Sequence, residues 1–296
     1  MSPDSAFVPV APETGAAQLK EPAPSTRALQ IANKPWPVDF DAMLERRMIR
    51  VAVPYRRTQC FVDQGSERGL AAKLIRDFER WVDKEHAGKL GEPPLTVYIV
   101  AATRDRLRPG LEAGLADIAV GNLTVTDECL AIVDFLAQES EAINTEVLVT
   151  GPATPEIAGI DDLSGKTVRV RKTSSHHASL VALNERLCQA GKAEVESVLV
   201  PEAVEDEGIL EMVNAGLLKA IVVDDRKARM WAQVLSKVTV REDVVLRAPT
   251  HKGWAVRKGS AQAWPRSGSL VQSCRGRDGR EDRHGNDDLC AQHLQV

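Results

Sequence analysis

The feature that most constrains this chain is an alternation of strand-like and helix-like segments that occurs twice in succession. The first set opens with the β-branched run Ile49–Val53, followed by Gly69–Val82, whose apolar residues recur at helical spacing. The predicted apolar face of that helix consists of Leu70, Leu74, Phe78 and Trp81. The set continues with a strand over Leu95–Ala101, a helix over Arg106–Ala113 and a strand over Ala116–Val120.

The second set opens with the apolar segment Glu146–Thr150, which the breaker Gly151-Pro152 ends. Its predicted strands are Lys166–Val170, Ser197–Val200 and Ala220–Val223, and its predicted helices are Ala178–Ala190, Ile209–Ala215 and Lys227–Leu235. Two further apolar segments, Val245–Arg247 and Trp254–Arg257, follow. Alternation of this kind predicts an α/β fold with two lobes, and ligands of such proteins bind in the crevice between them.

Changes in composition predict the domain boundaries. Residues 1–38 are rich in proline and alanine and read as a flexible leader, after which a short helix begins at Asp39, its predicted N-cap, with Met43, Leu44 and Met48 as its apolar face. We expect lobe 1 over 39–149, lobe 2 over 150–247 and a return segment to lobe 1 over 248–263. Residues 264–296 lose the apolar periodicity and read as a disordered tail.

Charge and composition exclude several functions. The net charge of −4 does not favour nucleic acid or an acidic membrane surface as a partner. The arginines between Arg46 and Arg57 are interrupted by Val51-Ala52-Val53, which indicates a strand with charged ends. No run approaches the ~18 apolar residues needed to span a bilayer, and no secretory signal is visible.

The cysteines and histidines predict neither a disulfide framework nor a metal centre. The five cysteines are irregularly spaced, without a CxxC pair or a Cys/His cluster. His176 and His177 are adjacent, and on a strand they would point to opposite faces. We therefore expect no metal and no cofactor.

Several strings, taken together and in order, resemble family-3 extracellular solute-binding proteins. They are Gly114–Ala119, Gly121–Thr126, Val133–Phe135, Asp162–Val168 (the pattern D-L-x-G-K-x-V), Ala220–Asp224 and Gly253–Gly259. The resemblance covers roughly residues 47 to 262. It implies a two-lobed type II periplasmic-binding fold, a monomer, a periplasmic location and a small-molecule ligand held by hinge closure.

The wording of 32–51 and 103–126 is more narrowly similar to modules that precede the catalytic domain of membrane-bound lytic murein transglycosylase F-like proteins. That similarity implies a regulatory module for an amino acid, peptide or muropeptide-like ligand, with peptidoglycan fragments as partners. The alternative is an amino-acid receptor that works with an ABC permease. A shifted reading of the codons for Asp288–Gln295 resembles the connector to such a catalytic domain, so we expect a frameshift after residue 260.

The resemblance also implies the ligand-binding residues. Asn122 and Thr124 fall at the first-lobe contacts for a carboxylate, the loop Thr173-Ser174-Ser175 at the second-lobe contacts, and Asp224 at the position that binds an ammonium group. Phe61 is expected to cover the apolar part of a ligand. The family pattern T-x-x-R reads Thr126-Asp127-Glu128-Cys129 here, so Cys129 stands where an arginine would clamp the carboxylate.

Structural interpretations of the same residues stay open beside these roles. The loop 173–175 could simply cap the helix after it, Asp224 and Asp225 could cap the helix Lys227–Leu235, and Cys129 could be a small packing residue. The Glu139-Ser140 pair matches the catalytic pair of transglycosylases but lacks their surrounding motif. No G-x-S-x-G pattern occurs, so we expect no catalytic site in this chain.

Overall fold

The computed structural model of the chain describes residues 34–136, 143–261 and 264. The predicted leader up to residue 33, the Glu139-Ser140 pair and the predicted frameshifted tail from residue 265 onward lie outside the described residues. None of the helices in the described ranges is long and apolar enough to cross a membrane.

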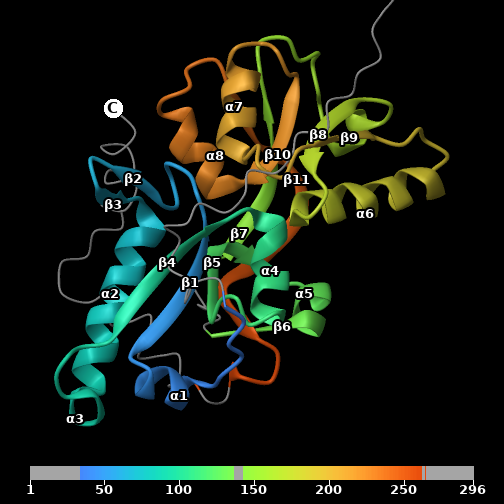
Figure 1. Ribbon diagram of the computed structural model, residues 1–296. Coiled ribbons are helices and arrows are strands. Elements are labelled where there is room, and N and C mark those ends of the chain that lie inside the picture. The colour runs from blue at the N-terminus through green and yellow to red at the C-terminus, as the bar shows by residue number, and fades with distance from the viewer. Residues whose placement is uncertain (1–33, 137–142, 262–263, 265–296) are drawn as a thin grey trace, which may run out of the picture.

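Nine of the described strands form one mixed sheet in the order β4-β1-β5-β11-β7-β10-β8-β9, with β6 paired to β11, and β2 and β3 form a separate pair. Figure 1 shows that this sheet divides into two lobes, each with helices on both faces. The first lobe is built around β4, β1 and β5, and the second around β7, β10, β8 and β9. The predicted α/β fold class is therefore present.

The first lobe contains three parallel strands at its centre, because β1 pairs in parallel with both β4 and β5. Its strands are β1 (Met48–Pro54), β4 (Thr96–Ala102), β5 (Ile118–Thr124) and β6 (Val133–Phe135), with a small hairpin of β2 (Phe61–Asp63) and β3 (Ser66–Arg68). Its helices are α1 (Phe40–Glu45), α2 (Leu70–Glu85), α3 (Ala87–Leu90), α4 (Arg104–Glu112) and α5 (Asp127–Ile132). Helices α1 and α2 pack on one face of the sheet and α4 on the other.

The second lobe has the same layered construction. Its strands are β7 (Ile143–Thr150), β8 (Thr167–Arg171), β9 (Glu196–Val200) and β10 (Ala220–Asp224). Its helices are α6 (Ser175–Gln189), α7 (Asp206–Asn214) and α8 (Asp225–Ala232), with a short 3-10 helix η2 (Ile160–Leu163). Helix α6 packs on one face of the sheet, and α7 and α8 pack on the other.

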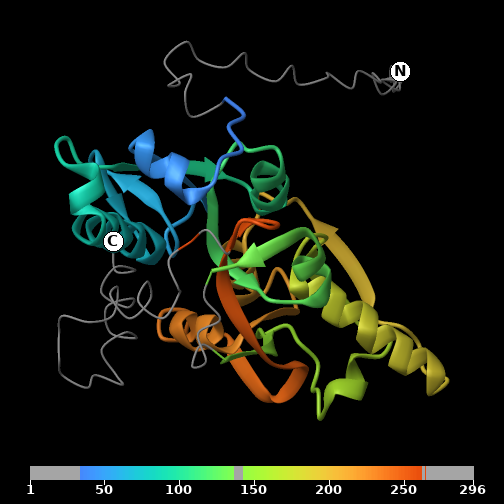
Figure 2. The ribbon, with the colours of Figure 1, turned by 90° about the horizontal axis from the view of Figure 1, so that it is seen from below.

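One long strand, β11 (Thr239–Arg257, 19 residues), joins the two lobes. Its early residues pair with β7, and its last residues pair with β5 and β6. Figure 2 shows this strand, orange to red, passing from one lobe into the other. The predicted return segment is thus part of a continuous strand, and the register shifts opposite β7 bend it on the way.

Two details of the element predictions were wrong. Met48 begins β1 and does not extend the helix from Asp39, which ends at Glu45. The predicted apolar face of α2 was also partly wrong, because it included Leu70, which is exposed. The buried residues of this helix are Ala71, Ala72, Ile75, Phe78 and Val82. Small alanines at the contact let the helix approach the sheet closely, and residue size alone does not show that.

The two apolar segments at Val245–Arg247 and Trp254–Arg257 are parts of β11. Sequence patterns missed the β2–β3 hairpin and α5, because both are short. Asp39 occupies the N-cap position of α1, but its side chain makes no capping bond and instead receives Arg257 Nη2 at 3.2 Å.

We predict that Gly121→Ala destabilises the protein by about 1–3 kcal/mol, because an added methyl group overpacks this site. A Cβ at Gly121 would lie 2.9 Å from Pro54 Cδ and 3.3 Å from Leu107 Cδ1, both on packed elements. Urea unfolding measures the effect. Gly88→Ala in α3 is the control, since nothing lies within 4 Å of its added Cβ. Equal unfolding midpoints for the two variants would contradict the prediction.

Candidate functional site

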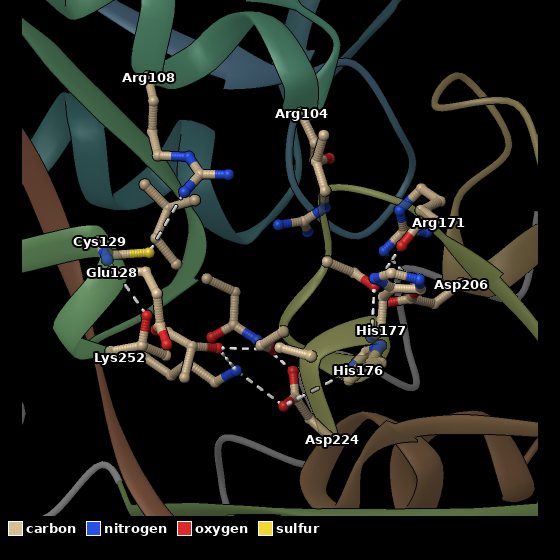
Figure 3. A pocket seen from close by; sticks show the side chains of 18 of the residues that line it. Arg104, Arg108, Glu128, Cys129, Arg171, His176, His177, Asp206, Asp224 and Lys252 are labelled. Atoms are coloured by element: carbon tan, nitrogen blue, oxygen red, sulfur yellow. Dashed lines mark hydrogen bonds and ion pairs between the residues drawn. The ribbon is translucent and has the colours of Figure 1, made fainter. Parts of the chain in front are cut away.

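A cavity of about 260 Å³ lies between the lobes and takes its walls from both of them. The first lobe contributes α4, the end of β5 and α5, and the second contributes the start of α6 and the end of β10 (Figure 3). All the predicted site residues except Phe61 are on its wall: Asn122, Thr124, Cys129, Thr173, Ser174, Ser175 and Asp224. Phe61 lies in the β2–β3 hairpin, paired with Arg68, and is not among the lining residues.

Asp224, the last residue of β10, is a buried carboxylate with an ion-pair partner at one oxygen and a hydrogen-bond donor at the other. Lys252 Nζ lies 2.8 Å from Oδ1, and Asn122 Nδ2 donates to Oδ2 at 2.9 Å. Burial raises the pKa of Asp224, but the charge of Lys252 and the contact with His176 outweigh it, so the pKa lies below its ordinary value. The Asp224 side chain makes no capping bond to α8, contrary to the capping interpretation.

Asn122 and Thr124 reach across the cavity from the end of β5. Asn122 has a φ of 57°, a left-handed conformation that asparagine tolerates better than most residues, and its amide contacts the second lobe through Asp224. Thr124 Oγ1 lies 3.0 Å from Ser175 Oγ and accepts from Lys252 Nζ at 2.6 Å. Both side chains therefore join the lobes directly.

The loop 173–175 is satisfied largely by the chain itself. The Thr173 amide and hydroxyl donate to the Glu202 carboxylate at 3.0 and 2.6 Å. Ser174 is the N-cap of α6, and its Oγ accepts from the His177 amide at 3.3 Å. Ser175 Oγ meets Thr124. The capping interpretation thus holds for Ser174, while a ligand role for the loop stays a prediction.

Cys129 lies in the first turn of α5, half-buried, and faces Arg108 of α4. The Cys129 amide donates to Thr126 Oγ1, the N-cap of this helix, at 3.2 Å. Arg108 Nη1 donates to Cys129 Sγ at 3.5 Å, and Figure 3 shows the guanidinium directed at the sulfur. The sequence predicted that an arginine is missing here, and the structure brings one from a neighbouring helix.

A second set of charges joins the lobes beside the cavity. Arg56 of the first lobe pairs with Glu205 and Glu207 at the start of α7, and Thr58 donates to Glu207. Arg104 Nε lies 2.9 Å from Glu205 Oε2. Burial raises the pKa of Glu207, whereas the charges of Lys227 and Arg56 lower it by more. We call these contacts the inter-lobe ion pairs.

Asp206 anchors the ion pairs within the second lobe. Its carboxylate receives Arg171 Nη2 at 2.6 Å and also pairs with Lys227. Burial raises its pKa, but Lys227 and Arg171 hold the pKa well below its ordinary value. The start of α7 is therefore held by cations of its own lobe as well as by Arg56 of the first lobe.

One buried cluster has the spacing of a metal site. Glu146, His176 and Asp224 place ligand atoms within 4.8 Å of one another. Arg247 Nε lies 3.5 Å from Glu146 Oε1, and Lys252 neutralises Asp224. These cations compete for the same carboxylates, so the arrangement favours internal ion pairs over a divalent cation. His176 and His177 lie in the first turn of α6, not on a strand.

Sequence reasoning missed Lys252, Arg108, Arg56 and Glu207. Lys252 immediately precedes the recognised string at Gly253, and Arg108 lies within the segment 103–126 used for the narrower similarity. Their roles depend on which elements meet across the cavity, and no local spacing reports that. The departure from the family pattern at Cys129 indicated only that the usual arginine is absent there.

Comparison with solved structures defines the class of fold. The arginine-bound, truncated ArgBP of T. maritima matches with a TM-score of 0.59 at 20% identity, covering 79% of this chain and 99% of that chain. An amino acid ABC transporter substrate-binding protein from Streptococcus pneumoniae, bound to L-arginine, matches with a TM-score of 0.61 at 15% identity, covering 86% and 96%. The chain therefore has the two-lobed, type II periplasmic-binding fold.

A third match is a putative L-cystine ABC transporter from Listeria monocytogenes, with a TM-score of 0.60 at 18% identity, covering 77% of this chain and 89% of that chain. No protein-family model and no curated protein matches the sequence. These three structures are described as binding or transport proteins.

We predict that Glu207→Gln loosens the contact between the lobes. The change removes the negative charge that pairs with Arg56 and accepts a hydrogen bond from Thr58. We expect the free energy of unfolding to fall by about 1–3 kcal/mol, because these buried donors lose a strong acceptor. Thermal unfolding and the radius of gyration from solution scattering measure it: we expect a lower midpoint and a larger radius. Glu211→Gln, at an exposed position of the same helix, is the control. Unchanged values in both variants would argue against a joining role.

The effect of Glu207→Gln should depend on pH. The folded-state pKa of Glu207 is depressed below its ordinary value, so the native state binds this proton less readily than the unfolded chain does. Its stabilisation is therefore full above the unfolded pKa of about 4.3 and is lost as the pH falls through the folded pKa. The difference in unfolding free energy between wild type and Glu207→Gln should shrink below about pH 4. A constant difference down to pH 3 would contradict this.

Proposed function

We propose that this chain is a solute-binding module that takes one small polar ligand into the cavity between its lobes. The observation that carries the proposal is the cavity itself, whose wall combines first-lobe and second-lobe side chains such as Asn122, Thr124, Ser175 and Asp224. A ligand touching both walls would couple its binding to the relative position of the lobes. The fold supports this role, because the matching structures bind their ligands as two-lobed proteins.

The comparisons support a transport receptor better than the module of a lytic transglycosylase. The solved structures that match are described with arginine or cystine and with ABC transporters. In that setting the partner is an ABC permease and the chain works outside the cytoplasm. In the transglycosylase setting the ligand would be a peptidoglycan fragment and closure would be read by a catalytic domain. Both settings share the binding step, and they differ in the ligand.

Binding can be tested by isothermal titration and thermal shift with arginine, cystine, small carboxylates and short muropeptides. A ligand at a hundred times its Kd stabilises the bound state by about 2.7 kcal/mol, which a thermal shift detects. Arginine or cystine binding favours the receptor, and muropeptide binding favours the transglycosylase module.

A cavity-filling variant locates the site. Ala178 lines the cavity at an exposed position of α6, so we expect Ala178→Trp to abolish binding by occupying the space without disturbing the core. Val181→Trp is the control, because Val181 is exposed on the same helix but is not among the lining residues. Binding that survives Ala178→Trp would place the ligand elsewhere and overturn the proposal.

A further inference from the structure

The carboxylate at one end of the cavity is already neutralised by the chain. Lys252 of β11 places Nζ 2.8 Å from Asp224 Oδ1, and Asn122 holds the other oxygen. Lys252 and Asp224 side chains are only 7% and 5% exposed, so this pair is shielded from solvent. A ligand ammonium at Asp224 would bring a second cation to one carboxylate, and like charges at that distance repel strongly where water is excluded.

The other cations that line the cavity are nearly all committed. Arg104 pairs with Glu205 at 2.9 Å, Arg171 with Asp206 at 2.6 Å, and Lys227 with Asp206 as well. Lys172 is exposed to solvent. Apart from the exposed Lys172, the second-lobe lysines and arginines on the cavity wall therefore carry internal pairs, as does Arg104 of the first lobe, and these groups offer little charge to a ligand.

Arg108 is different. It is half-buried on α4 and lines the cavity, and within the described ranges it has no carboxylate in ion-pair distance. Its Nη1 donates to the Cys129 sulfur at 3.5 Å. A thiol is a weak acceptor, so most of the five guanidinium donors of Arg108 remain available. Glu128 on the same wall is exposed and forms no ion pair with Arg108 among the described residues.

We propose that the cavity selects a small carboxylate that has no free ammonium group. Arg108 binds the carboxylate, and Lys252 occupies the place where a ligand ammonium would meet Asp224. This inference rests on the proposed function and narrows its ligand class. Hydroxy acids and N-acylated amino acids fit it, and free amino acids do not.

The test compares matched ligands by isothermal titration against the full chain. L-lactate and N-acetyl-L-alanine are each compared with L-alanine, and L-2-hydroxyglutarate with L-glutamate. We expect the member without an ammonium group to bind at least about tenfold more tightly in each comparison, the difference that ~1.4 kcal/mol produces. Tighter binding of the amino acids would overturn the inference while leaving the proposed function intact. Binding of neither series, nor of arginine, cystine or muropeptides, would overturn both.

Two variants separate the roles of the cations. Arg108→Gln should weaken binding of the preferred acid by about ten- to a hundredfold, because a charge-assisted bond is lost. Arg106→Gln on the same helix is the control, since Arg106 is exposed and does not line the cavity. Equal affinities in these two variants would exclude Arg108 as the carboxylate-binding residue.

Lys252→Met removes the ammonium group while keeping the length of the side chain. It leaves Asp224 without its cation, so we expect the preference to shift toward L-alanine and L-glutamate. A thermal melt shows whether the variant folds, and Arg108→Gln keeps the inference testable if it does not. A folded Lys252→Met protein with the wild-type preference would contradict the role given to Lys252.

Discussion

A carboxylate buried between two lobes needs a cation, and here the chain provides its own. Asp224 ends the central strand of the second lobe, and Lys252 reaches it from the strand that returns to the first. Beside this pair, Asn122 bonds to Asp224 and Thr124 accepts from Lys252, so first-lobe side chains surround the buried charge. Unpaired, either charge would cost several kcal/mol to bury.

The lobes of this protein are held together by its own side chains. At the cavity, the hydroxyl groups of Thr124 and Ser175 form a hydrogen bond, and beside it Arg56 forms an ion pair with Glu207. An incoming ligand does not fill an unsatisfied site but competes with existing contacts. Its affinity is the difference between new contacts and those it replaces. Of the buried and half-buried arginines and lysines that line the cavity in the described chain, Arg108 is the one without an acidic partner, and this makes it the natural starting point for recognition.

The sequence predicted the fold well and the site in part. Long β-branched runs such as Ile49–Val53 identify buried parallel strands, because both faces of such a strand are covered. The packing face of α2 was misjudged, because the buried Ala71 and Ala72 allow the helix to approach the sheet closely, whereas the prediction counted only large apolar side chains. Residues at strand ends, such as Asn122 and Asp224, were found. Lys252 and Arg108 were missed, because their partners come from other elements of the fold, and spacing along the sequence does not show which elements lie side by side.

The path of β11 also bears on the order in which the chain can fold during synthesis. The second lobe has all its strands once the first residues of β11 have emerged, whereas the first lobe waits for Gly253 to Arg257, which fill the gap between β5 and β6. Its core includes Val256, and Trp264 lies further on. The lobe that is made first is therefore finished last. A ribosome that stalls before residue 250 would release an incomplete sheet with an open strand edge, which is the kind of surface that aggregates.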